Sequence, residues 1–148
     1  MQKIIAAHDK FFVLAARAKP VVVLLSRVSL GVLFAQSGWG KLHHLSKIVE
    51  YFTSLGIPAP QLQAPFVAGT EFVCGVLVLI GLLTRLASIP LICTMIVAII
   101  TAKKADLDGV TDLFGIAEYL YILLFLYLIV DGPGPLSLDA VLRKRVRA

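Results

Sequence analysis

Four apolar segments of this chain are long enough to cross a lipid bilayer as helices, and three of them carry an ionisable residue. The segments cover residues 20–38, 64–83, 86–101 and 114–130, each near the ~20 residues that span ~30 Å of hydrocarbon. Arg27, Glu71 and Glu118 lie inside the first, second and fourth. Because a charge in hydrocarbon costs roughly 2.5–3.5 kcal/mol on insertion scales, each must be paired, hydrated or used.

The composition also indicates a membrane protein. The chain is 59% hydrophobic and 16% charged, with a mean hydropathy of +0.92, whereas soluble domains carry about 25% charged residues. The net charge of +5 does not indicate nucleic acid, because the basic residues flank apolar segments, where anionic lipid head groups are the expected partner. The length suits one compact unit. We therefore predict a single all-α transmembrane domain over residues 1–148, a four-helix bundle.

The basic residues predict the orientation of this bundle. With four spans, nine basic residues fall on the side of the termini and four on the other side: Lys3, Lys10, Arg17, Lys19, Arg85, Arg143, Lys144, Arg145 and Arg147, against Lys41, Lys47, Lys103 and Lys104. Cytoplasmic loops favour Lys and Arg, so both termini are predicted to be cytoplasmic, including a basic tail over residues 140–148. A signal peptide cleaved near residues 35–37 is the disfavoured alternative, because Arg27 interrupts its apolar region.

Two further segments are predicted to lie on the membrane surface. Residues 45–55 place apolar side chains on one helical face and end at Gly56 and Pro58. This pattern predicts a short interfacial helix that covers the space between the spans, although a loop packed on the bundle remains open. Residues 1–19 are predicted to form an amphipathic cytoplasmic segment, with an apolar stripe of Ile4, Ile5, Phe11, Phe12 and Ala15.

The sequence contains no motif for an intrinsic cofactor or metal. Cys74 and Cys93 stand alone in their segments, so there is no C-x-x-C redox pair or haem attachment motif. No glycine-rich phosphate loop is present. His43 and His44 are adjacent, and adjacent side chains diverge on a helix, so a solvated pair is expected instead of a metal site.

The carboxylates of Glu71 and Glu118 are predicted to share one polar cavity. Both lie in the outer half of their segments, and Gln36, Lys41 and Tyr121 can reach the same depth. Two carboxylates in one layer need a cation, a proton or a water path, and such a pair suits proton relay or binding of a polar head group. Replacing either by glutamine is expected to preserve folding and abolish function. A purely structural hydrogen-bond network is the alternative.

Arg27 lies in the inner half of its segment and is predicted to be structural. It can reach Asp131 or Asp139 near the inner ends of the bundle, which would form a buried ion pair. Its stripe continues through Gly31, Ala35 and Gly38, and a second small-residue stripe surrounds Glu71 at Ala64, Ala68 and Gly75. Small residues let helices approach closely in lipid.

A succession of short motifs resembles the DoxX family of small bacterial inner-membrane proteins, over roughly residues 24–142. The motifs are Arg27-Val-Ser-Leu-Gly31, Gly38-Trp-Gly40-Lys41-Leu42, Leu55-Gly-Ile-Pro58-Ala-Pro60, Glu71 followed by Cys74-Gly75, Gly81-Leu-Leu-Thr84-Arg85, Glu118-Tyr119, and Asp131-Gly-Pro-Gly134-Pro-Leu-Ser137-Leu-Asp139. The resemblance implies a four-helix bundle in the inner membrane, with polar positions at Arg27, Lys41, Glu71 and Glu118. The chain lacks the cysteine pair of a related maturation group, which disfavours a disulfide role.

Three function classes follow for this chain. Some relatives are membrane subunits of thiosulfate:quinone oxidoreductases, so the resemblance implies at most an accessory subunit with a quinone or similar molecule bound between the helices. Glu71 or Glu118 would then take protons, while Lys41 or Gln36 would bind carbonyl oxygens. A non-catalytic anchor for a partner enzyme and a small-solute transporter are the alternatives. Transport is disfavoured because no inverted repeat or broken helix is apparent, although a homodimer could supply both.

Overall fold

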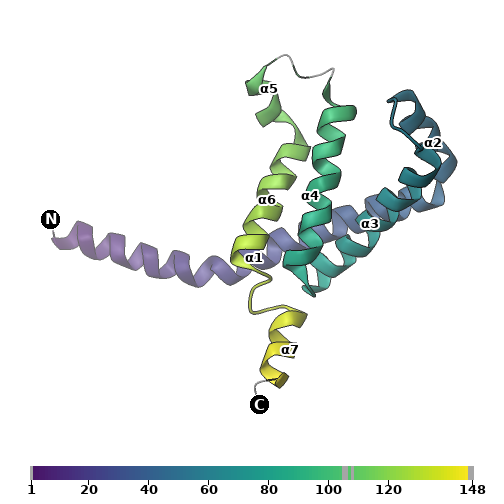
Figure 1. The fold of residues 1–148 in the computed structure, drawn as a ribbon. Helices are drawn as coiled ribbons and strands as arrows, with labels where there is room; N and C mark the ends of the chain where they lie inside the picture. Colours follow the sequence, from purple (N-terminus) through teal and green to yellow (C-terminus); the bar gives the residue numbers. More distant parts are fainter. Residues whose placement is uncertain (1, 105–106, 108, 147–148) are drawn as a thin grey trace.

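The computed structural model describes residues 2–104, 107 and 109–146, and this part of the chain is helical and contains no strand. The predicted all-α class is therefore confirmed. Figure 1 shows the helices in chain order: α1 Gln2–His43, α2 Leu45–Ser54, α3 Pro60–Ile80, α4 Thr84–Thr101, α5 Val110–Gly115, α6 Ala117–Asp131 and α7 Leu138–Val146.

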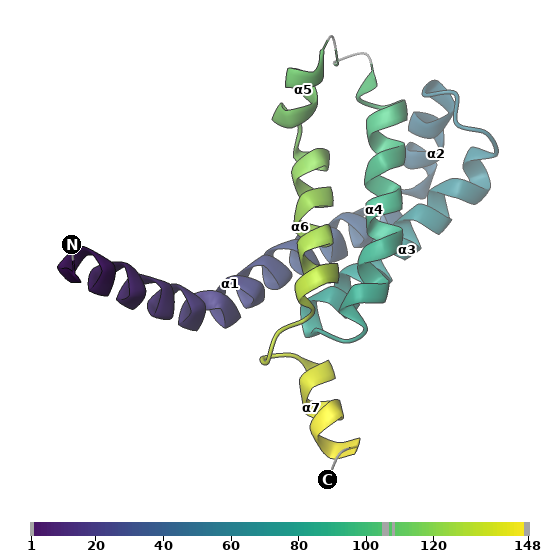
Figure 2. The same ribbon diagram turned by 60° about the vertical axis from the view of Figure 1, so that its left-hand side comes forward.

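Helix α1 is longer than the predicted first span. It runs without interruption through Pro20, so the helix extends beyond the predicted span of residues 20–38 at both ends. A proline removes one backbone N–H from the helix. The helix nevertheless continues, because the backbone of a segment in lipid must form its hydrogen bonds internally. The N-terminal part of α1 projects away from the other helices (Figures 1 and 2). Ile4, Ile5 and Phe11 of the predicted stripe lie outside the residues whose side chains are described.

Three helices within the described residues are long and apolar enough to span a membrane: Ala15–His43 within α1, Pro60–Ile80 and Thr84–Thr101. The turn between the last two lies at Gly81 to Leu83. The predicted segments 64–83 and 86–101 leave Thr84 and Arg85 as the connection, but these two residues are instead the first turn of α4. Gly81 has a φ of +73° and ends α3 in the left-handed conformation that glycine favours. Leu82 then donates its N–H to the Leu77 carbonyl at 2.9 Å, which closes the turn.

The predicted fourth span is divided in two. Helix α5 ends at Gly115, Ile116 is extended with φ −89° and ψ 143°, and α6 begins at Ala117. Glycine is a poor helix former, which explains where the helix stops. The 15 residues of α6 cover only about 22 Å at 1.5 Å per residue, so a fourth span remains a prediction. The expectation of unbroken helices was wrong.

Glycines bring α1 and α3 into close contact, as the small-residue stripes predict. A Cβ atom added at Gly38 would lie 2.3 Å from the Phe72 nitrogen, and one added at Gly75 would lie 2.5 Å from the Ala35 nitrogen. Helix α6 packs mainly on α4, and α4 also contacts α3. The buried core joins the two helix pairs through Val23, Leu30, Phe34, Val78, Ala87, Leu91, Met95, Phe125 and Leu128.

The connecting segments divide between the two ends of the bundle. Helices α2 and α5 lie toward one end, and the α3–α4 turn and α7 lie toward the other (Figures 1 and 2). Helix α2 confirms the helix predicted after the first span, and its position at a membrane surface remains a prediction. The predicted basic tail is mostly helical, because α7 covers Leu138–Val146.

Candidate functional site

A cavity of about 710 Å³ lies between the helices at the α2 end. Side chains of α1, α2, α3, α4 and α6 line it, and most of them are apolar. Helix α2 covers part of it with Ile48, Tyr51 and Phe52. Lys41, Glu71, Glu118 and Tyr121 are among its polar lining residues, joined by Ser37, Gln63, Thr70, Cys93, Thr94 and Lys103.

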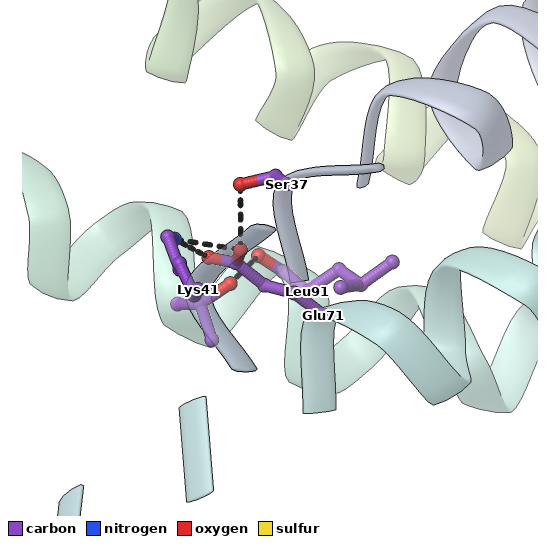
Figure 3. Close-up of polar contacts among 5 residues, drawn as sticks. Ser37, Lys41, Glu71 and Leu91 are labelled. Carbon is purple, nitrogen blue, oxygen red and sulfur yellow. Dashed lines mark hydrogen bonds and ion pairs between the residues drawn. The ribbon is translucent and has the colours of Figure 1, made fainter. Parts of the chain in front are cut away.

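The Glu71 carboxylate is held by two side chains of α1 (Figure 3). The Lys41 Nζ lies 2.5 Å from Oε1 and 2.6 Å from Oε2, and the Ser37 hydroxyl donates to Oε2 at 2.9 Å. Glu71 is only 2% exposed, whereas the Lys41 side chain is 28% exposed. The cation that pairs with the Glu71 carboxylate is therefore supplied from α1.

The backbone of α1 and α3 explains why these three groups meet. Ser37 and Lys41 are four residues apart, which places them on the same face of α1, one turn from each other. Gly38 lies between them and allows the backbone of α3 to approach, because a Cβ there would clash with Ala68 and Phe72. The ion pair thus depends on the small-residue contact beneath it.

Glu118 lies on the opposite helix pair and is held differently. It is the second residue of α6, directly after the break at Ile116, and its side chain lines the same cavity. It is partly exposed, and the described residues offer its carboxylate no hydrogen-bond or ion-pair partner. Tyr121, three residues later, also lines the cavity and packs edge-on against Phe34, with ring centroids 5.6 Å apart and planes at 79°.

Gln36 is the candidate residue that the structure separates from the others. It is exposed and lies in a shallow groove along α1, beside Val28 and Ser29, and it does not line the cavity. Ser37 also lines this groove, but of the two neighbouring residues only Ser37 also lines the cavity, because successive residues on a helix point about 100° apart. Sequence reasoning missed Ser37, although its four-residue spacing from Lys41 was a usable signal.

Arg27 is buried, at 4% exposed, but its predicted ion pair with Asp131 or Asp139 is wrong. Its guanidinium donates instead to two backbone carbonyls of the segment after α6, from Nη1 to Pro133 at 2.8 Å and from Nη2 to Leu136 at 2.6 Å. The two carbonyls accept from Nη1 and Nη2, whereas the Arg27 Nε is buried without a hydrogen-bond partner among the described residues. Arg27 thus fastens the C-terminal segment to α1.

The two aspartates have other partners. Asp131 pairs with Lys19 at 2.5 Å, and the Asp139 carboxylate accepts the Leu83 backbone N–H at 3.1 Å. The Asp139 N–H in turn donates to the Gly81 carbonyl at 3.0 Å. These contacts join α7 to the α3–α4 turn. The aspartates are therefore remote from the cavity and belong to the opposite end of the molecule.

The two cysteines are not bonded to each other, and the two histidines contact the backbone of their own helix. Both cysteines are free thiols; Cys74 packs against the core, whereas Cys93 is exposed on the cavity lining. His43 and His44 each contact, through Nδ1, the carbonyl one turn earlier, at 2.9 and 3.0 Å. The histidines therefore cap the end of α1.

Comparison with known proteins gives the family. The DoxX family model matches residues 22–104 of the 148, a range that contains Arg27, Lys41 and Glu71 but not Glu118. An uncharacterized membrane protein of Mycobacterium tuberculosis, Rv3486, is 35% identical over 140 residues, covering 87% of this chain and 86% of its own length. CatD of Bacillus subtilis, whose name provisionally calls it an oxidoreductase, is 35% identical over 117 residues, covering 78% and 83%.

A third relative, the inner membrane protein YqjF of Escherichia coli, is 29% identical over 129 residues, covering 87% of this chain and 98% of its own. No solved structure matches the chain. The family model covers more than half of the sequence, and two of these relatives exceed 30% identity along most of their length. The chain is a multi-pass membrane protein that belongs to the DoxX family.

Proposed function

We propose that this protein is a redox-associated membrane subunit that binds a quinone or a similar small amphipathic molecule in the cavity between its helices. The observation that carries the proposal is the cavity itself. Its volume of about 710 Å³ lies within the roughly 300–1,000 Å³ of typical ligand pockets. Such pockets are mostly apolar with a few convergent polar groups, and this one has Lys41, Glu71, Glu118 and Tyr121.

The chemistry of the lining suits a planar ring with polar substituents and an apolar tail. The ammonium of Lys41 has three N–H donors, and Glu71 engages it through both oxygens at 2.5 and 2.6 Å, which leaves donor capacity for a bound oxygen atom. Aromatic side chains from three helices, Phe34, Phe66 and Tyr121, offer faces and edges to a ring.

A partner enzyme is part of the proposal. The sequence carries no motif for an intrinsic redox cofactor, so electrons would pass to or from the bound molecule through a second protein. The name of the relative CatD supports a redox association. We place the protein in the inner membrane, as the name of YqjF states for that relative, with both termini in the cytoplasm as the basic residues predict.

Small-solute transport is the second candidate, and one observation favours it. The helix is broken at Ile116, two residues before Glu118, and the cavity lies beside this break. Discontinuous helices at a binding site are a feature of many transporters. A transported solute would leave during purification, whereas a quinone with an apolar tail would be retained by apolar contacts.

The test is to identify what the purified protein contains. The protein is extracted in mild detergent, and its optical spectrum and solvent-extracted small molecules are measured. We expect a quinone in near-stoichiometric amount. In Ala98→Trp, the indole fills the cavity and the quinone should be lost; Ile96→Trp is the matched control, because Ile96 is 44% exposed and does not line the cavity. An empty cavity together with a co-purifying soluble enzyme would instead show a non-catalytic anchor.

A further inference from the structure

The two glutamates of the cavity differ in whether other residues of the protein already bind their carboxylates. Both oxygens of Glu71 are engaged, at 2.5 to 2.9 Å, by Lys41 and Ser37, and the residue is 2% exposed. Glu118 faces the same cavity, is partly exposed, and has no partner within the described part of the chain. Of the two glutamates, Glu118 therefore has the larger unused acceptor capacity for a bound molecule.

We infer that Glu118 is the residue that receives the ligand, and that it selects a ligand with a hydrogen-bond donor, so that the cavity prefers a hydroquinone to the corresponding quinone. The inference rests on the proposed function and concerns the same cavity. An ionised carboxylate only accepts hydrogen bonds, and a quinone carbonyl also only accepts them. A hydroquinone hydroxyl donates, and a bond from it to a carboxylate is of the strong, charge-assisted kind.

Glu118 stands at the N-terminal end of a helix and is partly exposed. It lies in the first turn of α6, where the partial positive charge of the helix N-terminus stabilises a negative side chain. Partial exposure of Glu118 allows water to solvate the charge until a ligand displaces it.

Tyr121 supplies the second half of the ligand contact. It lies on the same face of α6 as Glu118, because the two are three residues apart. Its ring is fixed by the edge contact with Phe34 at 5.6 Å. A ring whose hydroxyl reaches Glu118 would thus lie beside an aromatic surface that is already positioned.

Three probes that differ only in the head group test this inference: decylhydroquinone kept reduced, its dimethyl ether, and decylbenzoquinone. Binding to the detergent-solubilised full-length protein is measured by native mass spectrometry and titration calorimetry. Wild type is expected to bind decylhydroquinone at least about tenfold more tightly than the other two, the usual size of a hydrogen bond to a charged group. Glu118→Gln should remove most of this preference, with little effect on the dimethyl ether.

Two further variants complete the design. Glu118→Asp keeps the charge and should keep the order of preference. Glu50→Gln is the matched control, since Glu50 lies on α2, is exposed and does not line the cavity, so its removal should leave all three affinities unchanged. Thermal unfolding of each variant shows that the comparison is made on folded protein.

The possible results separate the inference from the proposed function. Equal affinity of wild type for the hydroquinone and the benzoquinone, or an equal loss of all three ligands in Glu118→Gln, overturns the inference while quinone binding stands. Failure of wild type to bind any of the three probes overturns both. A preference that survives in Glu118→Gln and disappears in Glu71→Gln would assign the contact to the other carboxylate and also overturn the inference.

Discussion

The ion pair between Lys41 and Glu71 allows a prediction about stability that the two single variants should answer differently. Removing one partner of a buried pair typically costs about 3–5 kcal/mol, because the other charge is left uncompensated. Lys41→Met leaves the carboxylate of Glu71 at 2% exposed, with only Ser37 as a donor. The loss of unfolding free energy in Lys41→Met should therefore be near the upper end of that range. Glu71→Gln leaves the cation on a side chain that is 28% exposed and can extend to water, so we expect only about 1–3 kcal/mol.

The double variant decides whether the pair itself is responsible. Lys41→Met combined with Glu71→Met replaces both charges with flexible apolar side chains, and such replacements are often neutral or stabilising. The double variant should therefore be more stable than Lys41→Met alone. Ser37→Ala is a milder comparison and should cost about 1 kcal/mol for one hydrogen bond.

Unfolding of detergent-solubilised protein by increasing SDS can be followed through Trp39. It is the only tryptophan in the chain and packs on Phe72, with ring centroids 5.4 Å apart, beside the ion pair. Its fluorescence therefore reports separation of α1 from α3. Additive effects of the two single variants, or a Lys41→Met variant as stable as wild type, would refute the reasoning.

Three further predictions concern the rest of the molecule. Arg27→Ala leaves the backbone carbonyls of Pro133 and Leu136 without their donor. We therefore expect the free energy of unfolding to fall by about 3 kcal/mol or more and the segment before α7 to be cleaved faster by proteases. An unchanged rate of proteolysis would contradict this prediction. Gly75→Ala places a Cβ 2.5 Å from the Ala35 nitrogen and should lower the free energy of unfolding by about 1–3 kcal/mol. Gly69→Ala is the control and should be tolerated, because a Cβ there meets no atom within 4 Å. Equal stability of the two variants would argue against close packing of α1 on α3. In Arg145→Cys, the new thiol should not be labelled by membrane-impermeant thiol reagents in intact cells, because the basic residues predict a cytoplasmic C-terminus. Labelling of this thiol would show that the C-terminus lies outside and that the predicted topology is wrong.

The features that sequence reasoning predicted well depend on strong, local patterns. Long apolar segments predict helices because lipid leaves the backbone no other way to satisfy its polar groups. The glycine stripe of α1 predicts close packing because only residues without a large side chain permit it, and Gly31 and Gly38 each lie against the backbone of α3. Lys41, Glu71, Glu118 and Tyr121 were grouped mainly by their predicted depth, and they line one cavity.

The features that were mispredicted depend on which way a side chain points from its helix and on the local conformation of the backbone. Gln36 was grouped with Lys41 by depth, but neighbouring residues on a helix diverge, and depth carries no information about the face. Arg27 was assigned a carboxylate because carboxylates are visible in a sequence, whereas backbone carbonyls are not. Gly132 and Gly134 have φ of +86° and +76°, and the segment they shape presents the carbonyls that Arg27 binds.

The revised roles of the two glutamates alter what their neutral variants should do. The sequence alone predicted that Glu71→Gln and Glu118→Gln both fold normally. The structure supports that expectation for Glu118, whose carboxylate makes no contact that an amide would lose, but Glu71 is the acceptor of an ammonium and a hydroxyl.

The buried charges of this protein can be divided by whether the fold itself satisfies them. Arg27 donates from Nη1 and Nη2 to two backbone carbonyls at one end of the bundle, and Glu71 accepts from Lys41 and Ser37 at the other. Both contacts hold helices or segments together, so structure is sufficient to account for them. Glu118 faces the cavity without such a contact within the described residues. A carboxylate that lines a mostly apolar cavity and stabilises no packing contact is best explained by a molecule that binds to it.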